Sequence, residues 1–188
     1  MWIRRLTKLE APQLEALILA LPAEQRRLRF CTSMSAEAVK RYVDKFDWQH
    51  GDVFGAFSGL ELIGALELVP SGERALEGAL EVHPDHQGQG VAKKLVERGI
   101  LHAKVLGKAE LQLNCMSENV AMKRLARRHG MELVSSHGDV ESRLKLGPAV
   151  PADFVQLGWQ TFHAMSEGSR AATGWLNRPG IVRRPKSP

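Results

Sequence analysis

The stretch that decides the fold reads EVHPDHQGQGVAKKL, Glu81–Leu95. It follows an apolar segment and leads into a run whose apolar residues have helical spacing. A strand that ends in a glycine-rich turn and enters a helix points several backbone N–H groups, and the positive end of the helix dipole, at one place. Side chains at Gly88 and Gly90 would keep a pyrophosphate away from those amides. The stretch therefore predicts a phosphate-binding loop, with Lys93 and Lys94 adding positive charge.

Length and composition fit a single globular domain that binds something anionic. The chain has 188 residues, of which 44% are hydrophobic and 25% charged, and its formal net charge is +5. Cys31 and Cys115 form neither a CxxC nor a Cys/His ligand pattern, so we expect no disulfide scaffold and no metal site. A reducing, cytoplasmic setting is predicted. No apolar run is long enough to cross a bilayer, so we expect no membrane partner.

The spacing of apolar residues predicts alternating helices and strands. Helices are expected over 11–21, 24–29, 35–46, 92–106 and 118–129, with Ser35 and Ser117 as N-caps of the third and the fifth. Strands are expected within 1–8, as a hairpin over 51–70, and over 75–82, 109–115, 131–135 and 141–146. This order predicts an α/β (α+β) fold with a mostly antiparallel sheet flanked by helices.

A boundary is expected near Pro148. Residues 1–147 then form the main domain, and residues 148–188 form an extension with a helix over 152–165 and a mobile arm from Gly168 onward. The arm is basic, but it lacks the interleaved aromatic residues and the recognition helix that nucleic-acid binding would need. Aromatic residues are expected to dock the extension on the domain or on the second subunit of a homodimer, namely Trp159, Phe162 and Trp175.

Two well-known phosphate loops do not fit the glycine stretch. The chain contains no Walker string, and the third glycine of a dinucleotide fingerprint is replaced by Lys93. A third pattern, Q/R-x-x-G-x-G/A, is met by consecutive residues, namely Gln87, Gly88, Gln89, Gly90, Val91 and Ala92. It resembles the coenzyme A loop of the GNAT superfamily of N-acetyltransferases. Val82, Pro84 and Leu95 fit the longer family signature, and the resemblance covers the chain to about Leu146.

The resemblance implies a splayed sheet and transfer of an acetyl or short acyl group from acetyl-CoA to a primary amine, of a small molecule or of a protein. The backbone from Gln87 to Ala92, with Lys93 beside it, would hold the pyrophosphate. The Val82 backbone would lie along the pantetheine and the acyl carbonyl, and Asn119 would bond the pantetheine arm.

The catalytic residues are less clearly indicated. The amine must lose a proton, and Glu77 or Glu81 could accept it, although both also suit a solvated or ion-paired strand face. Many family members have a tyrosine acid where this chain has Ala126. Water, Ser117 or Cys115 could replace it, or the thiolate could leave unassisted. An acyl-cysteine intermediate on Cys115 is a further reading, less favoured than simple packing. A coenzyme A-binding or sensing module without turnover is the alternative function.

The acceptor itself is not identified by the sequence. The early helices would cover it in this family, so Arg29, Phe30 and Tyr42 are candidates for contact with the amine. An ordinary amphipathic helix, with basic residues outward and Phe30 inward, explains the same pattern.

Overall fold

One mixed sheet organises the part of the chain that the structure describes, residues 1–136 and 138–176 of a computed structural model. Its seven strands within those residues have the order β1-β2-β3-β4-β5-β7-β6, and only β4 and β5 are parallel. The strands are β1 (Trp2–Arg5), β2 (Asp52–Ser58), β3 (Glu61–Ser71), β4 (Ala75–Val82), β5 (Glu110–Met116), β6 (Glu132–Ser136) and β7 (Asp139–Lys145). The helices are α1 (Ala11–Ala20), α2 (Ala23–Phe30), α3 (Ala36–Asp44), α4 (Val91–Val105), α5 (Val120–Arg128) and α6 (Pro151–Leu176), with 3-10 turns η1 (Lys8–Glu10) and η2 (Pro84–His86). The predicted mixed, mostly antiparallel sheet flanked by helices is confirmed.

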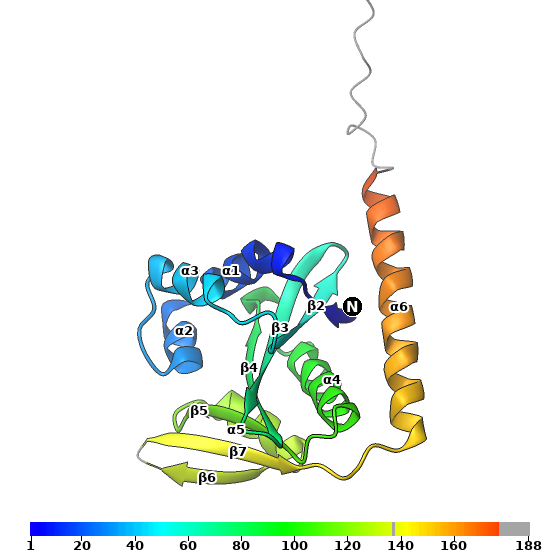
Figure 1. Cartoon of the computed structure of the whole chain (residues 1–188). Coiled ribbons are helices and arrows are strands. Elements are labelled where there is room, and N and C mark those ends of the chain that lie inside the picture. Colours follow the sequence, from blue (N-terminus) through cyan, green and yellow to red (C-terminus); the bar gives the residue numbers. More distant parts are fainter. Residues whose placement is uncertain (137, 177–188) are drawn as a thin grey trace, which may run out of the picture.

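The sheet opens between β4 and β5. These strands pair only from Ala75–Gly78 against Glu110–Leu113. Gly78 ends the pairing, and a Cβ there would lie 2.6 Å from Leu113 Cδ2, so glycine permits the close approach. Beyond this point β4 continues beside β3 and β5 continues beside β7. Figure 1 shows β5, β6 and β7 turned away from β4, which is the splay that the family resemblance predicts.

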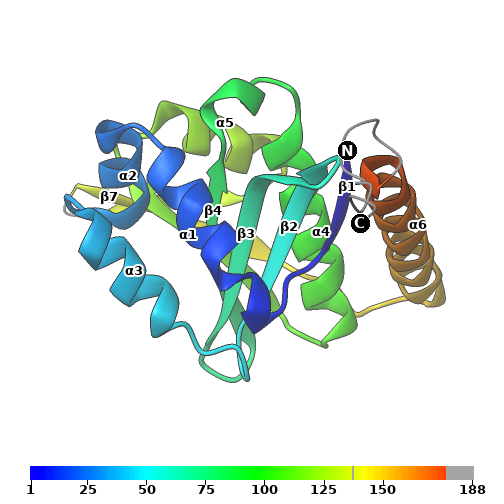
Figure 2. The same cartoon turned by 90° about the horizontal axis from the view of Figure 1, so that it is seen from above.

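Helices cover both faces of the sheet. In Figures 1 and 2, α1, α2 and α3 lie on one side of β2, β3 and β4, α4 lies on the other, and α6 stands beyond the edge strand β1. Each side has its own core, one including Leu14 and Val39, the other Leu66 and Leu95. Because β2 and β3 are covered on both faces, most of their residues are buried and their sequences are almost continuously apolar.

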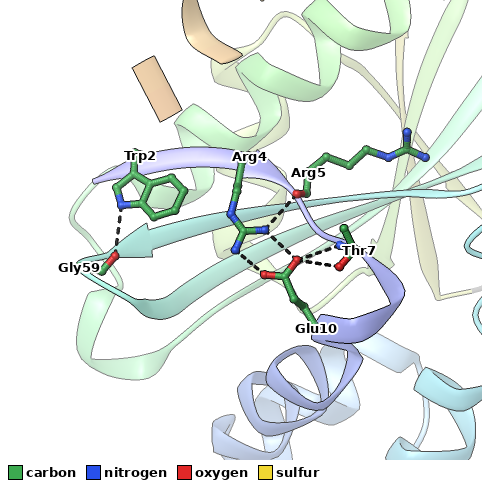
Figure 3. Close-up of polar contacts among 6 residues, drawn as sticks. All are labelled: Trp2, Arg4, Arg5, Thr7, Glu10 and Gly59. Carbon is green, nitrogen blue, oxygen red and sulfur yellow. Dashed lines mark hydrogen bonds and ion pairs between the residues drawn. The ribbon is translucent and has the colours of Figure 1, made fainter. Parts of the chain in front are cut away.

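The start of the chain is anchored at the edge of the sheet (Figure 3). The Trp2 indole donates to the Gly59 carbonyl at 3.2 Å and stacks on Phe57 at 4.6 Å between ring centroids. Glu10 pairs with Arg4 and accepts a hydrogen bond from the Thr7 amide at 3.0 Å. These bonds hold β1 to the turn that begins α1. The helix α6 in turn packs against β1.

The extension packs along β1 and α4. Ala164 is buried there, and Gly168 lies so near the Trp2 ring that a Cβ would approach it to 3.1 Å. The predicted arm from Gly168 is wrong in its first part, since α6 continues to Leu176. Residues 177–188 and the side chain of Trp175 lie outside the described residues. None of the described helices combines the length and the apolarity needed to cross a membrane.

One of the two predicted helix N-caps is confirmed and the other is wrong. The Ser35 hydroxyl accepts from the Ala38 amide at 3.2 Å and caps α3 as expected. Ser117 does not cap α5. Instead the Asn119 side chain accepts from the Met122 amide at 3.0 Å, and the helix begins at Val120, two residues later than predicted.

Candidate functional site

A cleft of about 760 Å³ occupies the opening between β4 and β5. Its walls come from α2, β4, β5, the N-terminal end of α4 and one face of α5 along its whole length. Most of the residues predicted for the site line it, namely Arg29, Phe30, Glu77, Glu81, Val82, Gln87, Gly88, Gly90, Val91, Ala92, Lys93, Cys115 and Asn119. Gln89, Ser117 and Tyr42 are not part of its lining. The opened sheet therefore brings together segments that are far apart in the sequence.

The glycine loop presents free backbone amides. Gly88 and Gly90 have φ of +73° and +82°, a region that strains any residue with a Cβ, and Gly90 is the N-cap of α4. A Cβ built at either glycine meets nothing within 4 Å, so the space above the loop is open. Among the described residues, the amides from Gly88 to Lys93 have no hydrogen-bond acceptor. Six donors at a helix N-terminus suit a phosphate group.

Side chains of the loop brace its backbone. Gln87 Nε2 donates to the Val82 carbonyl at 3.1 Å and to Gln25 Oε1, on α2, at 2.8 Å. Gln89 Nε2 donates to the Asp85 carbonyl at 2.9 Å. Gln89 therefore contributes its backbone amide and this hydrogen bond to the loop. Its side chain does not line the cleft.

Lysine and arginine side chains also line the cleft. Lys93 lines it, with its Nζ 3.3 Å from Glu97 Oε1 on the next turn. Lys94, which was also expected to add positive charge for a phosphate, does not line the cleft and lines a separate cavity between α4 and α6. Arg124 and Arg128, one turn apart on α5, also line the cleft. Neither arginine was predicted from the sequence, although their i, i+4 spacing places both on one helix face.

The free edge of β4 faces the same opening. The His83 amide donates to the Ile63 carbonyl at 2.9 Å, so residue 83 is bonded toward β3. In an antiparallel pair the bonding direction alternates along the strand, and the backbone of Val82 therefore points toward the gap. Its carbonyl is taken by Gln87, and its N–H remains available to a ligand that lies along β4.

A buried charge cluster forms the other end of the cleft. Arg29 donates through Nη2 to Glu67 Oε1 at 2.8 Å and through Nε to Glu81 Oε2 at 2.9 Å. Tyr42 donates to Glu67 Oε2 at 2.5 Å and stands edge-on to the ring of Phe30. Arg29 and Phe30 line the cleft, whereas Tyr42 supports them from behind. Glu67 was missed; a lone carboxylate within the apolar run GALELVP was the signal for it.

The two predicted strand carboxylates have different surroundings. Glu81 has no exposed side-chain surface, and its Oε1 has no hydrogen-bond partner among the described residues. Burial raises the pKa of Glu81 to about 8; Arg29 opposes this shift and the nearby Glu67 adds to it. Glu77 is only partly buried, lines the cleft and accepts a hydrogen bond from Asn114 Nδ2 at 3.0 Å.

The remaining predicted catalytic groups are less suited to chemistry. Cys115 is 2% exposed, and burial raises the pKa of its thiol, which disfavours the thiolate that a nucleophile needs. Ser117 sits in the turn before α5, where its amide donates to the Gly138 carbonyl at 2.9 Å. Among the described residues, no group of three or more His, Cys, Asp or Glu side chains is placed to hold a metal ion.

Known proteins resemble this chain in sequence and in fold. L-amino acid N-acyltransferase MnaT of Escherichia coli (strain K12) is 29% identical over 103 residues, which are 55% of this chain and 59% of that protein, so the match spans less than two thirds of the relative. The GNAT domain of S. lividans PAT has a TM-score of 0.66 at 23% identity, covering 77% of this chain and 89% of that one. The structure of yncA, a putative acetyltransferase from Salmonella typhimurium with its cofactor acetyl-CoA, has a TM-score of 0.61 at 20% identity, covering 80% and 96%.

The sequence profile of one family covers the region that builds the cleft. The profile of the Acetyltransferase (GNAT) family matches residues 21–131, from the end of α1 through α5. This span includes the glycine loop, both strands that part and the helix that carries Asn119. By this match and by its fold, the chain belongs to the GNAT acetyltransferase family.

Proposed function

We propose that this chain is an N-acyltransferase that uses acetyl-CoA and a primary amine as substrates. The observation that carries the proposal is the row of unpaired amides from Gly88 to Lys93 at the open edge of a parted sheet. Acetyl-CoA supplies an activated thioester, from which the amine nitrogen takes the acyl group while the thiolate leaves. The solved structure of yncA with acetyl-CoA supports this choice of donor.

The donors in the cleft match the parts of coenzyme A. The loop amides and the N-terminus of α4 would bind the pyrophosphate, with Lys93, Arg124 and Arg128 supplying positive charge. The Asn119 carboxamide oxygen is used by the cap of α5, which leaves its amide N–H₂ for a carbonyl of the pantetheine arm. The Val82 N–H would stabilise negative charge that develops on the acyl oxygen.

We assign the proton-accepting role to Glu77. A general base must reach the amine directly or through one water, and Glu77 is the β4 carboxylate that is partly exposed in the cleft. Glu81 is fully enclosed and bonded to Arg29, so it serves as a positioning residue for the acceptor end. Ser117 lies outside the lining and Ala126 is buried, which leaves water or the Cys115 thiol as proton donors to the leaving thiolate.

The acceptor end of the cleft favours a protonated amine in the encounter complex. Arg29 is the cation there and is bonded to Glu67 and to Glu81, which holds a proton up to about pH 8. Glu77 adds a further carboxylate on the cleft lining. Residues of α2 place Arg29 and Phe30 over this end. A small amine, including the amino group of an L-amino acid, or the amino group of a protein could enter it; the E. coli relative is named for L-amino acids.

A module that binds acyl-CoA without turnover is the second candidate. It is favoured by one observation. Ala126 is buried at the position where many family members have a tyrosine that acts as general acid. We also propose that residues 1–147 form the acyltransferase unit and that residues 148–188 are an appended segment, because the sheet ends with β7 at Lys145 and α6 begins at Pro151.

Thiol release separates the two functions. Acetyl-CoA is incubated with L-amino acids, polyamines and short peptides, and free coenzyme A is measured. We expect release with one class of amine, and a fall in kcat/KM of about 10²-fold or more for Glu77→Gln. The control, Glu73→Gln, makes the same charge change in the exposed turn before β4 and should be silent. Binding without release for every amine would assign the second function, and full activity of Glu77→Gln would remove Glu77 as the base.

A further inference from the structure

The helix α6 is amphipathic, but its large apolar side chains are exposed, whereas an ordinary surface helix buries them. Its large apolar side chains are mostly exposed, with exposed fractions of 53% for Phe154, 72% for Val155, 67% for Trp159, 66% for Phe162 and 69% for Met165. Trp159 stands at one edge of this set and also lines the cavity between α6 and α4. At 100° per residue these five, with Gly158 among them, span an arc of about 140°. We call these six residues the apolar stripe.

The opposite face of α6 already has its partners. Gln160 and Thr161 accept hydrogen bonds from Arg98 at 2.9 Å and 3.4 Å, and Asp153 lies 3.8 Å from Lys104. Figure 2 shows α6 beside β1 and α4 with its far side uncovered by any other labelled element. The domain therefore binds a face of α6 that combines these polar side chains with Ala164 and Gly168, and leaves most of the apolar stripe in water.

We propose that the apolar stripe is the interface of a homodimer in which α6 packs on α6 of a second copy. The stripe exposes roughly 600 Å² of side-chain surface, the upper end of what a typical monomer leaves in one patch. A stable dimer buries about 800 Å² on each partner, so the stripe and its polar rim are large enough. A two-fold interface must be complementary to itself, and an uncharged apolar strip meets that condition.

The stripe fits a second copy better than its other conceivable occupants. Within α6 the charged residues are few, and Glu167 and Arg170 pair with each other at 3.1 Å. An interfacial membrane helix would carry lysine and arginine along its polar face, whereas α6 has Arg170 alone. Residues 177–188 contain two large aliphatic residues, Ile181 and Val182, too few to cover five large side chains.

An antiparallel pairing gives the stripe a consistent register. With the two-fold axis near residue 160, Phe162 stands opposite Gly158 of the partner subunit, a large side chain over a glycine. Phe154 and Val155 then meet Met165 of the partner subunit. Trp159 and Phe162 lie nearest the axis, where the centre of an interface contributes most to affinity.

The oligomeric state of the full chain tests the proposal. Light scattering and sedimentation velocity should give twice the 20.8 kDa of one chain at high concentration, with dissociation on dilution. Trp159→Glu and Phe162→Glu should each raise the dimer dissociation constant by about tenfold or more. Both side chains are two-thirds exposed, so the fold should persist, as circular dichroism would verify.

A matched control is available on the same molecule. Leu9, in η1, is 92% exposed and lies off the stripe, so Leu9→Glu adds the same charge without affecting the dimer. A wild-type chain that stays monomeric at every concentration would overturn the proposal, as would a Phe162→Glu dimer as tight as the wild type. A monomer that sediments with phosphatidylcholine–phosphatidylserine vesicles would also overturn it and assign the stripe to a lipid surface.

Discussion

Two buried carboxylates share a single guanidinium at the acceptor end of the cleft. Glu67 and Glu81 both accept from Arg29, and neither has more than 2% of its side chain exposed. Burying two negative charges against one positive charge favours uptake of a proton, which explains why the pKa of Glu81 lies near 8. The cluster fixes the position of Arg29 and limits its ability to bind an anionic group of the acceptor.

This proton has a measurable effect on stability. The folded protein holds it up to about pH 8, whereas the unfolded chain loses it near the ordinary value of 4.5. The folded state therefore binds more protons in this range, and the free energy of unfolding falls as pH rises from about 5 to 8. Glu81→Gln cannot ionise, so its urea midpoint should lack this part of the fall. The matched control is Glu73→Gln, and curves of wild type and Glu81→Gln that stay parallel in pH would refute the shifted pKa.

At this scale the sequence identified the loop better than the charge cluster. The spacing of Gly88 and Gly90 carries its own physical reason, because both adopt positive φ and must leave open space. The role of Glu67 depends on Arg29, which is 38 positions earlier in the chain. Contacts of that kind are set by tertiary packing, and no local pattern encodes them.

At the scale of elements, one residue of α5 both stabilises the helix and makes the proposed contact with the cofactor. The Asn119 oxygen caps the helix, and the residue lines the cleft. Asn119→Ala should cost about 0.5–2 kcal/mol of stability, since it removes the cap. Asn119→Ser keeps a capping oxygen and should preserve stability while both variants weaken acetyl-CoA binding.

The comparison of these two variants separates the roles of Asn119. Thermal unfolding measures the cap, and calorimetric titration with acetyl-CoA measures the contact with the pantetheine arm. Wild-type affinity in Asn119→Ser would show that the residue only caps α5.

Element types were predictable, whereas several boundaries differ from the predicted ones, most of them by one or two residues. Periodicity found β4 at its observed bounds, 75–82, because its apolar and polar residues alternate. The start of α5 was misplaced because Ser117 and Asn119 are both good caps, and the choice depends on the path of the turn. The length of α6 was underestimated because Gly168 looked like a helix end, whereas it makes room for Trp2.

At the scale of the whole molecule, the cleft offers basic residues for the anionic acetyl-CoA and acidic residues for the amine. Lys93, Arg124 and Arg128 line the cleft together with the glycine loop, and Glu77 and Glu81 line it from β4. The net charge of +5 predicted an anionic ligand but not where it would bind. The strand order, with one parallel pair at the centre, opens the cleft in which these charged residues come together.

The most direct test of the account is isothermal titration of acetyl-CoA into wild type, Gly90→Ala and Gly72→Ala. Both glycines have positive φ, +82° and +68°, and open surroundings, so both variants carry a similar backbone cost of about 1–2 kcal/mol. Gly72 lies in the turn between β3 and β4, away from the cleft lining. We predict one site in wild type, unchanged affinity in Gly72→Ala and at least about tenfold weaker binding in Gly90→Ala, where the methyl group meets the pyrophosphate. No binding by wild type, or equal affinity of the two variants, would contradict the proposed coenzyme A site.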